Sequence, residues 1–155
     1  MPLLLLSVAL AVIAALVTGS LWLGGRHDAS LRQAEGDARR AAVSYAVDLT
    51  TYDYTSLDRD FDWVTRGATA SFAGEYGKAN QPLRAVITKL KARATGSVSE
   101  AAATASSASK VRVLIFVNQT IVNGTNAKRR TERNRVVMTM VRRDGRWLVD
   151  DVALR

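Results

Sequence analysis

The chain begins with a long apolar segment. Residues 3–23 read LLLLSVALAVIAALVTGSLWL, in which no side chain is charged. About 20 apolar residues in a helix span the roughly 30 Å hydrocarbon core of a bilayer. A cleaved signal peptide would need a basic start and a cleavage site with small residues, and the segment has neither. We therefore predict that residues 1–25 form a retained transmembrane anchor.

The following segment has apolar positions three and four residues apart. This spacing is typical of one face of a helix and predicts a membrane-proximal helix within residues 26–54. The face is rich in alanine, which allows another helix or a sheet to approach closely. Its predicted members are Leu31, Ala34, Ala38, Ala41, Tyr45, Leu49 and Tyr52.

Two more helices are predicted over residues 55–96. Thr55 and Ser56 precede several aspartates, which is typical of the start of a helix. Pro82 suits the first turn of the second of these helices, and Gly96 suits its end. The predicted buried face of this last helix consists of Leu83, Val86, Ile87, Leu90 and Ala94.

Residues 97–155 change to a period of two. Residues 97–107 form a weak Ala/Ser/Thr strand, and residues 111–117 alternate Val or Ile with other side chains. Two further strands are predicted over residues 136–141 and 147–152, and the Asp144-Gly145 pair between them favours a hairpin turn.

The order of these elements predicts an α+β domain over residues 26–155. Three helices followed by about four antiparallel strands fit a nuclear transport factor 2-like cone, in which the helices pack on a curved sheet. Such a cone often contains a pocket between helices and sheet. Trp63 and Trp147 are the predicted core anchors. A cone filled by aromatic side chains would favour a scaffold, whereas an open pocket would favour a carrier; the expected fillers are Phe61, Phe72, Phe116 and Trp147.

The composition excludes several kinds of chemistry. The chain has no cysteine and one histidine, His27, so thiol catalysis, zinc–thiolate sites and Ser-His-Asp triads are not expected. Asp58, Asp60 and Asp62 resemble the start of a calcium loop, but Trp63 replaces the required glycine and no closing glutamate follows. We therefore predict no metal, no cofactor and no catalytic residue.

The net charge of +8 is concentrated in the last third of the chain. Residues 1–100 carry 11 basic and 10 acidic side chains, whereas residues 101–155 carry 11 basic and 4 acidic ones. A nucleic-acid reader would interleave exposed aromatic residues, and no such motif is present. We predict contact with anionic lipid or an acidic partner, with a merely solvated basic face as the alternative. The residues concerned are Lys128, Arg129, Arg130, Arg133, Arg135, Arg142 and Arg143.

A pocket is the second candidate site. Asp48 and Tyr52 are four residues apart on one helix face, so the two side chains can meet. An isomerase of this fold would use such a carboxylate as base and the tyrosine as oxyanion donor. Alternatively, the tyrosine packs at a helix corner. Gln119 interrupts an apolar strand, where it either bonds across the sheet or lines the mouth of the pocket.

Three separated strings resemble one protein family. They are LTTYDY at residues 49–54 with SLDRDF at 56–61, FVNQT at 116–120 with Asn123, and DGRWLVDDV at 144–152. In this order they are similar to the Mce-associated membrane proteins of actinobacteria, where Mce stands for mammalian cell entry. Asn118 stands where that family more often has aspartate.

The resemblance implies an accessory protein and not an enzyme. Such proteins are anchored in the plasma membrane by a single span, with the soluble domain outside the cytoplasm. They accompany Mce transporter subunits, which carry lipids, and stabilise or assemble the complex; the plan also resembles an inner-membrane scaffold of type IV secretion systems. A carrier or isomerase for lipids or steroids is the alternative, and self-association stays open. The arginines that follow the span would by themselves place the domain inside the cell, so charge leaves its orientation open.

Overall fold

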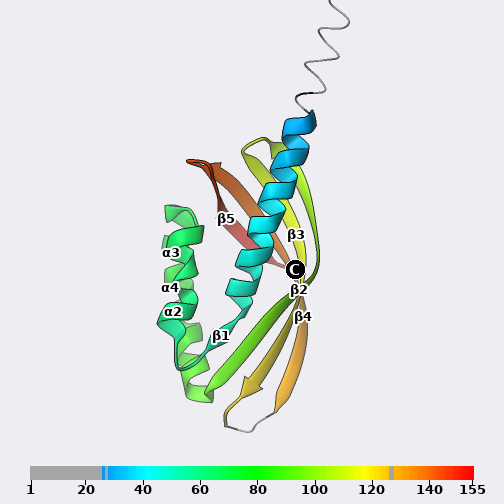
Figure 1. The fold of residues 1–155 in the computed structure, drawn as a ribbon. Helices are drawn as coiled ribbons and strands as arrows, with labels where there is room; N and C mark the ends of the chain where they lie inside the picture. Colours follow the sequence, from blue (N-terminus) through cyan, green and yellow to red (C-terminus); the bar gives the residue numbers. More distant parts are fainter. Residues whose placement is uncertain (1–25, 27, 126–127) are drawn as a thin grey trace, which may run out of the picture.

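The fold consists of helices packed on one face of a bent antiparallel sheet (Figure 1). The computed structural model describes residue 26, residues 28–125 and residues 128–155. A helix over residues 28–50, called the N-terminal helix below, lies across the sheet. Three further helices follow, namely α2 (Leu57–Phe61), α3 (Trp63–Gly67) and α4 (Ala70–Leu90).

The sheet has its strands in sequence order, each antiparallel to its neighbour. It confirms the predicted α+β class and the nuclear transport factor 2-like arrangement, with one short additional strand before the expected four. The strands are β1 (Tyr52–Asp53), β2 (Ala92–Ser107), β3 (Lys110–Asn123), β4 (Arg129–Arg143) and β5 (Arg146–Leu154).

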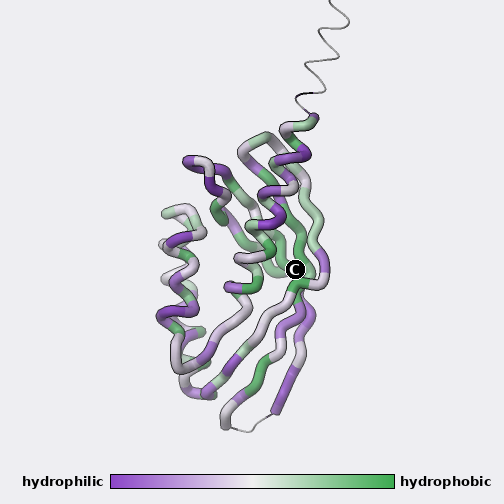
Figure 2. The backbone as a smooth tube through the Cα atoms, in the orientation of Figure 1, coloured by the Kyte–Doolittle hydropathy of each residue, from purple (hydrophilic) through white to green (hydrophobic). Residues whose placement is uncertain are grey.

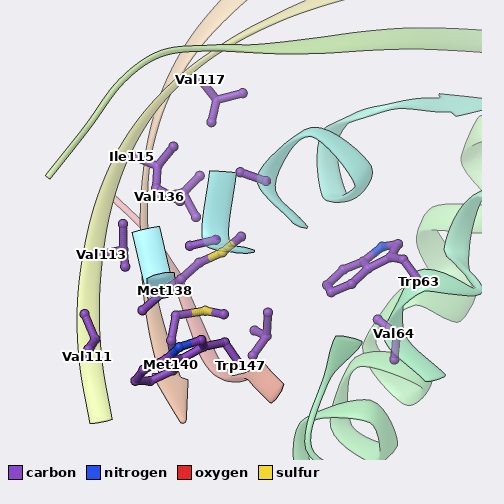
Figure 3. Close-up of a cluster of buried hydrophobic side chains, with 14 of the residues drawn as sticks. Trp63, Val64, Val111, Val113, Ile115, Val117, Val136, Met138, Met140 and Trp147 are labelled. Atoms are coloured by element: carbon purple, nitrogen blue, oxygen red, sulfur yellow. The ribbon is translucent and has the colours of Figure 1, made fainter. Parts of the chain in front are cut away.

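The core lies between the N-terminal helix and the middle of the sheet (Figure 3). Alternate residues of β3 and β4 point inward, and register pairs such as Val113 and Met138 place them side by side. The hydropathy agrees with this position of the core, because the apolar part of the sheet lies at its centre (Figure 2). The fully buried sheet residues are Val111, Val113, Ile115, Val117, Val136, Met138, Met140 and Val149.

Small side chains bring the N-terminal helix close to this sheet. The buried positions lie four residues apart, which confirms the predicted alanine-rich face but centres it on Ala42 and Ala46. Tyr45 and Leu49 lie at its half-buried flank. The stripe consists of Ala34, Ala38, Ala42 and Ala46, and it is continued by the buried Thr50.

The end of this helix contacts β2 at a glycine. A Cβ atom on Gly96 would lie 1.9 Å from Thr50 Oγ1, so no larger residue fits without displacement. The Gly96 N–H also donates to Thr51 Oγ1 at 3.1 Å. Gly96 therefore serves the close approach of helix and strand.

The prediction of a helix from Pro82 to Gly96 was wrong at both ends. Pro82 lies inside α4 at an exposed position, where water can replace the backbone hydrogen bond that a proline removes. The helix ends at Leu90, and Lys91 takes the left-handed conformation. Ala94, which we expected on the buried helix face, and Gly96 both belong to β2.

One predicted position of an aromatic side chain was wrong. Trp63 and Trp147 are buried, as predicted for core anchors. Phe116, which we expected to fill the cone, points to the outer face of the sheet and is 41% exposed. The predicted hairpin is confirmed, because Asp144 and Gly145 both have positive φ, as this turn requires.

Within the described part of the chain, no helix is long and apolar enough to cross a membrane. The predicted anchor at residues 1–25 lies outside the described residues.

Candidate functional site

Two adjoining clefts lie between α4 and the ends of β3 and β4. One has a volume of about 630 Å³ and the other of about 370 Å³. Both are lined by Tyr52, Leu83, Ile121 and Arg130, so they form one continuous depression, called the α4 groove below. Its apolar walls consist of Leu49, Tyr52, Phe61, Phe72, Tyr76, Leu83, Val86, Ile87, Leu90, Ile121, Val152 and Leu154.

One face of α4 supplies half of this lining. Phe72, Tyr76, Leu83 and Leu90 lie at helical intervals, and Ile121 faces them from the inner side of β3. Leu83 is 44% exposed and Val86 is 52% exposed. The carboxyl-terminal half of α4 therefore leaves part of its apolar face in contact with solvent.

A cluster of aromatic rings lies at the Phe72 end of the groove. Tyr76 contacts Phe61, Trp63 and Phe72, with ring centroids 5.5–6.3 Å apart. Burial raises the pKa of the Tyr76 hydroxyl, and the nearby side chains of Asn80 and Trp63 oppose this shift. The Tyr76 hydroxyl is consequently uncharged at physiological pH, and the rings pack together at this end.

Charged groups meet at the middle of the groove. Arg130 Nη2 and Glu132 Oε1 are 2.6 Å apart. Burial raises the pKa of Tyr52, Glu132 raises it further, and Arg130 lowers it. The Tyr52 hydroxyl therefore interacts electrostatically with both charged side chains.

The structure brings together two of the three predicted pocket residues. Tyr52 and Gln119 both line the α4 groove, and Gln119 Nε2 donates to the Thr50 carbonyl at 2.9 Å. Asp48 instead lines a separate cleft of about 200 Å³ beside Arg66. Burial raises the pKa of Asp48, whereas Arg66 lowers it. The separation arises because the helix ends at residue 50, before Tyr52.

The string at residues 49–61 builds the corner after the N-terminal helix. Asp53 Oδ1 accepts hydrogen bonds from the Thr55 N–H at 2.9 Å and the Thr55 hydroxyl at 2.7 Å. Its Oδ2 accepts one from Arg93 Nε at 2.6 Å. The Thr55 bonds, followed by Arg93, lower the pKa of Asp53 to about 2. Asp60 Oδ2 accepts from the Asp53 N–H at 2.7 Å, so this string stabilises the fold.

The seven predicted basic contact residues do not form one patch. Arg130 faces the α4 groove, and Lys128 lines its lower end. Arg129, Arg133 and Arg135 alternate with the groove-facing residues and lie on the outer face of β4. Arg142 and Arg143 lie at the opposite end of β4, roughly 40 Å from Arg130 and roughly 23 Å from Arg135 along the strand.

An outer-face patch surrounds Phe116. It consists of Arg112, Leu114, Phe116, Arg133 and Arg135, which lie on the outer side of β3 and β4. Phe116 pairs with Arg135 in register, and Leu114 is 36% exposed. Among the described residues, the three arginines have no carboxylate within ion-pair distance. The sequence pattern predicted Phe116 as a filler of the cone and did not single out Arg112 or Leu114, although strand alternation places all three opposite the buried valines.

Metal binding has no support in the part of the chain that the structure describes. There, no group of three or more His, Cys, Asp or Glu side chains could hold a metal ion. The aspartates of the calcium-like string instead bond to nearby groups, as Asp62 does to Thr65 at 2.9 Å.

Comparison with solved structures assigns the class of domain. CagV, a VirB8 homologue of the type IV secretion system of Helicobacter pylori, superimposes with a TM-score of 0.60. It is 17% identical, and the match covers 77% of this chain and 97% of CagV. The periplasmic domain of DotI gives a TM-score of 0.62 at 14% identity, over 76% of this chain and 91% of that domain. The fold is thus that of VirB8-like, nuclear transport factor 2-like domains.

The chain belongs to the family described as "Uncharacterized protein Rv1363c/MT1408-like", whose model matches residues 1–154. It is 29% identical over 123 residues to Rv1362c of Mycobacterium tuberculosis, a match that covers 76% of this chain and 56% of Rv1362c. It is 30% identical over 129 residues to the outer membrane protein Rv1973 of the same organism, covering 81% of this chain and 78% of Rv1973. The chain therefore spans little more than half the length of Rv1362c.

Proposed function

We propose that the chain is a non-catalytic accessory protein of the cell envelope that assembles or stabilises an Mce-type lipid transport complex. In this proposal residues 1–25 anchor it in the plasma membrane and residues 26–155 lie outside the cytoplasm. Three observations support it: the strings at residues 49–61, 116–120 and 144–152, the relative named as an outer membrane protein, and the fold shared with a periplasmic domain.

The main structural observation in support of this proposal is the outer-face patch. Its exposed Phe116 and Leu114 lie on β3, the central strand of the sheet, whose backbone pairs with a neighbouring strand on both sides. Arginine and aromatic side chains dominate the binding energy of many protein interfaces. The flanking Arg133 and Arg135 are free to pair with carboxylates of an acidic partner. The patch is therefore a docking surface that needs no change in the fold.

The isomerase-like alternative has a weaker basis. It needs a carboxylate base and a tyrosine donor that face one cavity. Asp48 and Tyr52 line different clefts, and Gln119 holds the end of the helix through the Thr50 carbonyl. The groove consequently lacks the pair of groups on which that alternative rested.

Co-purification from the native membrane tests the proposal. The full-length protein is extracted in mild detergent, and the proteins that accompany it are identified by mass spectrometry. Reversing the charges of the patch with Arg133→Glu and Arg135→Glu should reduce the recovery of Mce transporter subunits by about tenfold. The matched control is Arg142→Glu with Arg143→Glu, which changes the charge equally at the far end of β4 and should leave recovery unchanged.

Two results would contradict the proposal. Equal recovery with the patch variant would exclude the outer face as the docking surface. Absence of Mce subunits from every preparation would exclude the association itself. Flotation with anionic vesicles, if lost in the patch variant alone, would assign the arginines to lipid instead of protein.

A further inference from the structure

We propose that the α4 groove binds a single-chain amphiphile, with its apolar chain along α4 and its anionic head at Arg130. This inference is independent of the docking role proposed for the outer face. It rests on the lining, the shape and the distribution of charge in the groove.

The lining of the groove favours an apolar occupant. Leu83 and Val86 are about half exposed on one wall, and Ile121 and Tyr52 face them from the other. Large aliphatic side chains grouped in a concave site gain by contact with an apolar ligand, which removes them from water. Among the α4 side chains that line the groove, Ile87 is the one that is fully buried. It belongs to a small cluster with Leu57, Phe61 and Ala92.

The shape of the groove favours an extended chain over a compact ring system. From Leu83, where the two clefts join beside Arg130, the α4 wall extends to Phe72 on one side and to Leu90 on the other, which corresponds to about 16 Å and about 10 Å of helix. The two clefts join end to end at Leu83 and Ile121, and their volumes of about 630 and 370 Å³ lie in the range of small-molecule sites. An elongated site of this kind accommodates an acyl chain that extends from the junction along α4.

The charges along the groove are asymmetric. Arg130 lies where the two clefts join, and Lys128 lies in the smaller cleft beyond it. The acidic side chains, Glu75, Glu132 and Asp151, line the larger cleft, and Glu132 already pairs with Arg130. A guanidinium has five N–H donors, so Arg130 keeps donors for a second anion while it holds Glu132. The remaining donors therefore favour an anionic head on the side of the junction that faces the smaller cleft, whose lining has no acidic side chain.

Photo-crosslinking locates the ligand directly. The full chain is held in amphipol and exposed to palmitic acid that carries a diazirine in its chain, and the labelled peptides are mapped by mass spectrometry. We expect adducts on α4 and on the end of β3. Leu83→Trp fills the groove and should reduce labelling by about tenfold, whereas Leu114→Trp makes the same change on the outer face and should not.

The head group is tested by competition. Unlabelled palmitate should compete about tenfold less well after Arg130→Gln, because a charge-assisted contact is lost. Unlabelled hexadecanol should be unaffected by this change, and Arg135→Gln on the outer face should alter neither competitor. Labelling outside the groove, or labelling that Leu83→Trp leaves unchanged, would overturn the proposed site. Equal competition by palmitate in Arg130→Gln and wild type would overturn the anionic head.

Discussion

The two halves of the inner face of the sheet are covered by helices of very different character. The N-terminal helix contacts one half through a stripe of alanines. In this half, called the upper half below, the inward-facing residues of β3 between Val111 and Val117 are fully buried. The lower half faces α4, whose large side chains Leu83 and Val86 stay about half exposed beside the α4 groove. Small side chains allow a helix to pack closely on a sheet, whereas large side chains on a helix that lies farther from the sheet leave a groove between the two.

This difference separates the closely packed part of the molecule from the part in which we propose a binding site. The upper half is a core in which each buried side chain has neighbours on all sides, so its residues serve stability. The groove half is only partly packed, so its residues are available for a ligand at small cost to the fold. Three predictions test this division, in order of decreasing effect.

The largest contrast is expected between two truncations. Ile115→Ala removes a fully buried side chain from the upper half and should lower the free energy of unfolding by about 3 kcal/mol. Leu83→Ala removes a side chain from the groove wall and should cost less than about 1 kcal/mol. Denaturant unfolding of both variants measures the contrast. Equal losses would show that the groove wall is as much a part of the core as β3.

A second contrast concerns two glycines. Gly96→Ala would place a Cβ atom 1.9 Å from Thr50 Oγ1 and should cost about 2 kcal/mol, because the helix end must move away from β2. Gly74 lies in α4 with open space around it, and Gly74→Ala should stabilise the protein by about 0.5–1 kcal/mol. The measurement is the shift in unfolding midpoint for each variant. A neutral Gly96→Ala would mean that the helix and the strand are not in close contact there.

The smallest expected effect depends on pH. Asp53 has a folded pKa of about 2, below the ordinary value of 3.8 for an aspartate, so its charged form favours the folded state. Its contribution is complete above pH 4 and is lost as the pH falls through about 2. Asp53→Asn should therefore lower the melting temperature slightly at pH 6, and the gap to wild type should close between pH 4 and pH 2. A gap that stays constant over this range would assign the effect to the loss of hydrogen-bond geometry instead of charge.

Sequence patterns predicted the parts of the fold in which local and tertiary preferences agree. Alternation located the buried residues of β3, and helical spacing located the alanine stripe. Pro82 and Gly96 misled because both are common at helix ends, whereas here tertiary structure decides their roles. Pro82 is tolerated inside α4 at an exposed position, and Gly96 is required by the close approach of Thr50.

The candidate sites were harder to predict, for a related reason. The groove depends on how far α4 stands from the sheet, which no local pattern records. Asp48 and Tyr52 separate because the helix ends between them, and the seven basic residues divide because alternate positions of a strand face opposite sides. Phe116 shares its strand with the core but points away from it, so the docking role that we propose for it depends on its neighbours Arg133 and Arg135.

The division between a packed half and a binding half is tested most directly by amide hydrogen exchange. The full chain in amphipol is compared with and without palmitate. We predict slower exchange in residues 79–90 of α4 and residues 119–123 of β3, with no change in residues 111–117 beneath the N-terminal helix. Equal protection of both halves, or no change in either, would contradict the account.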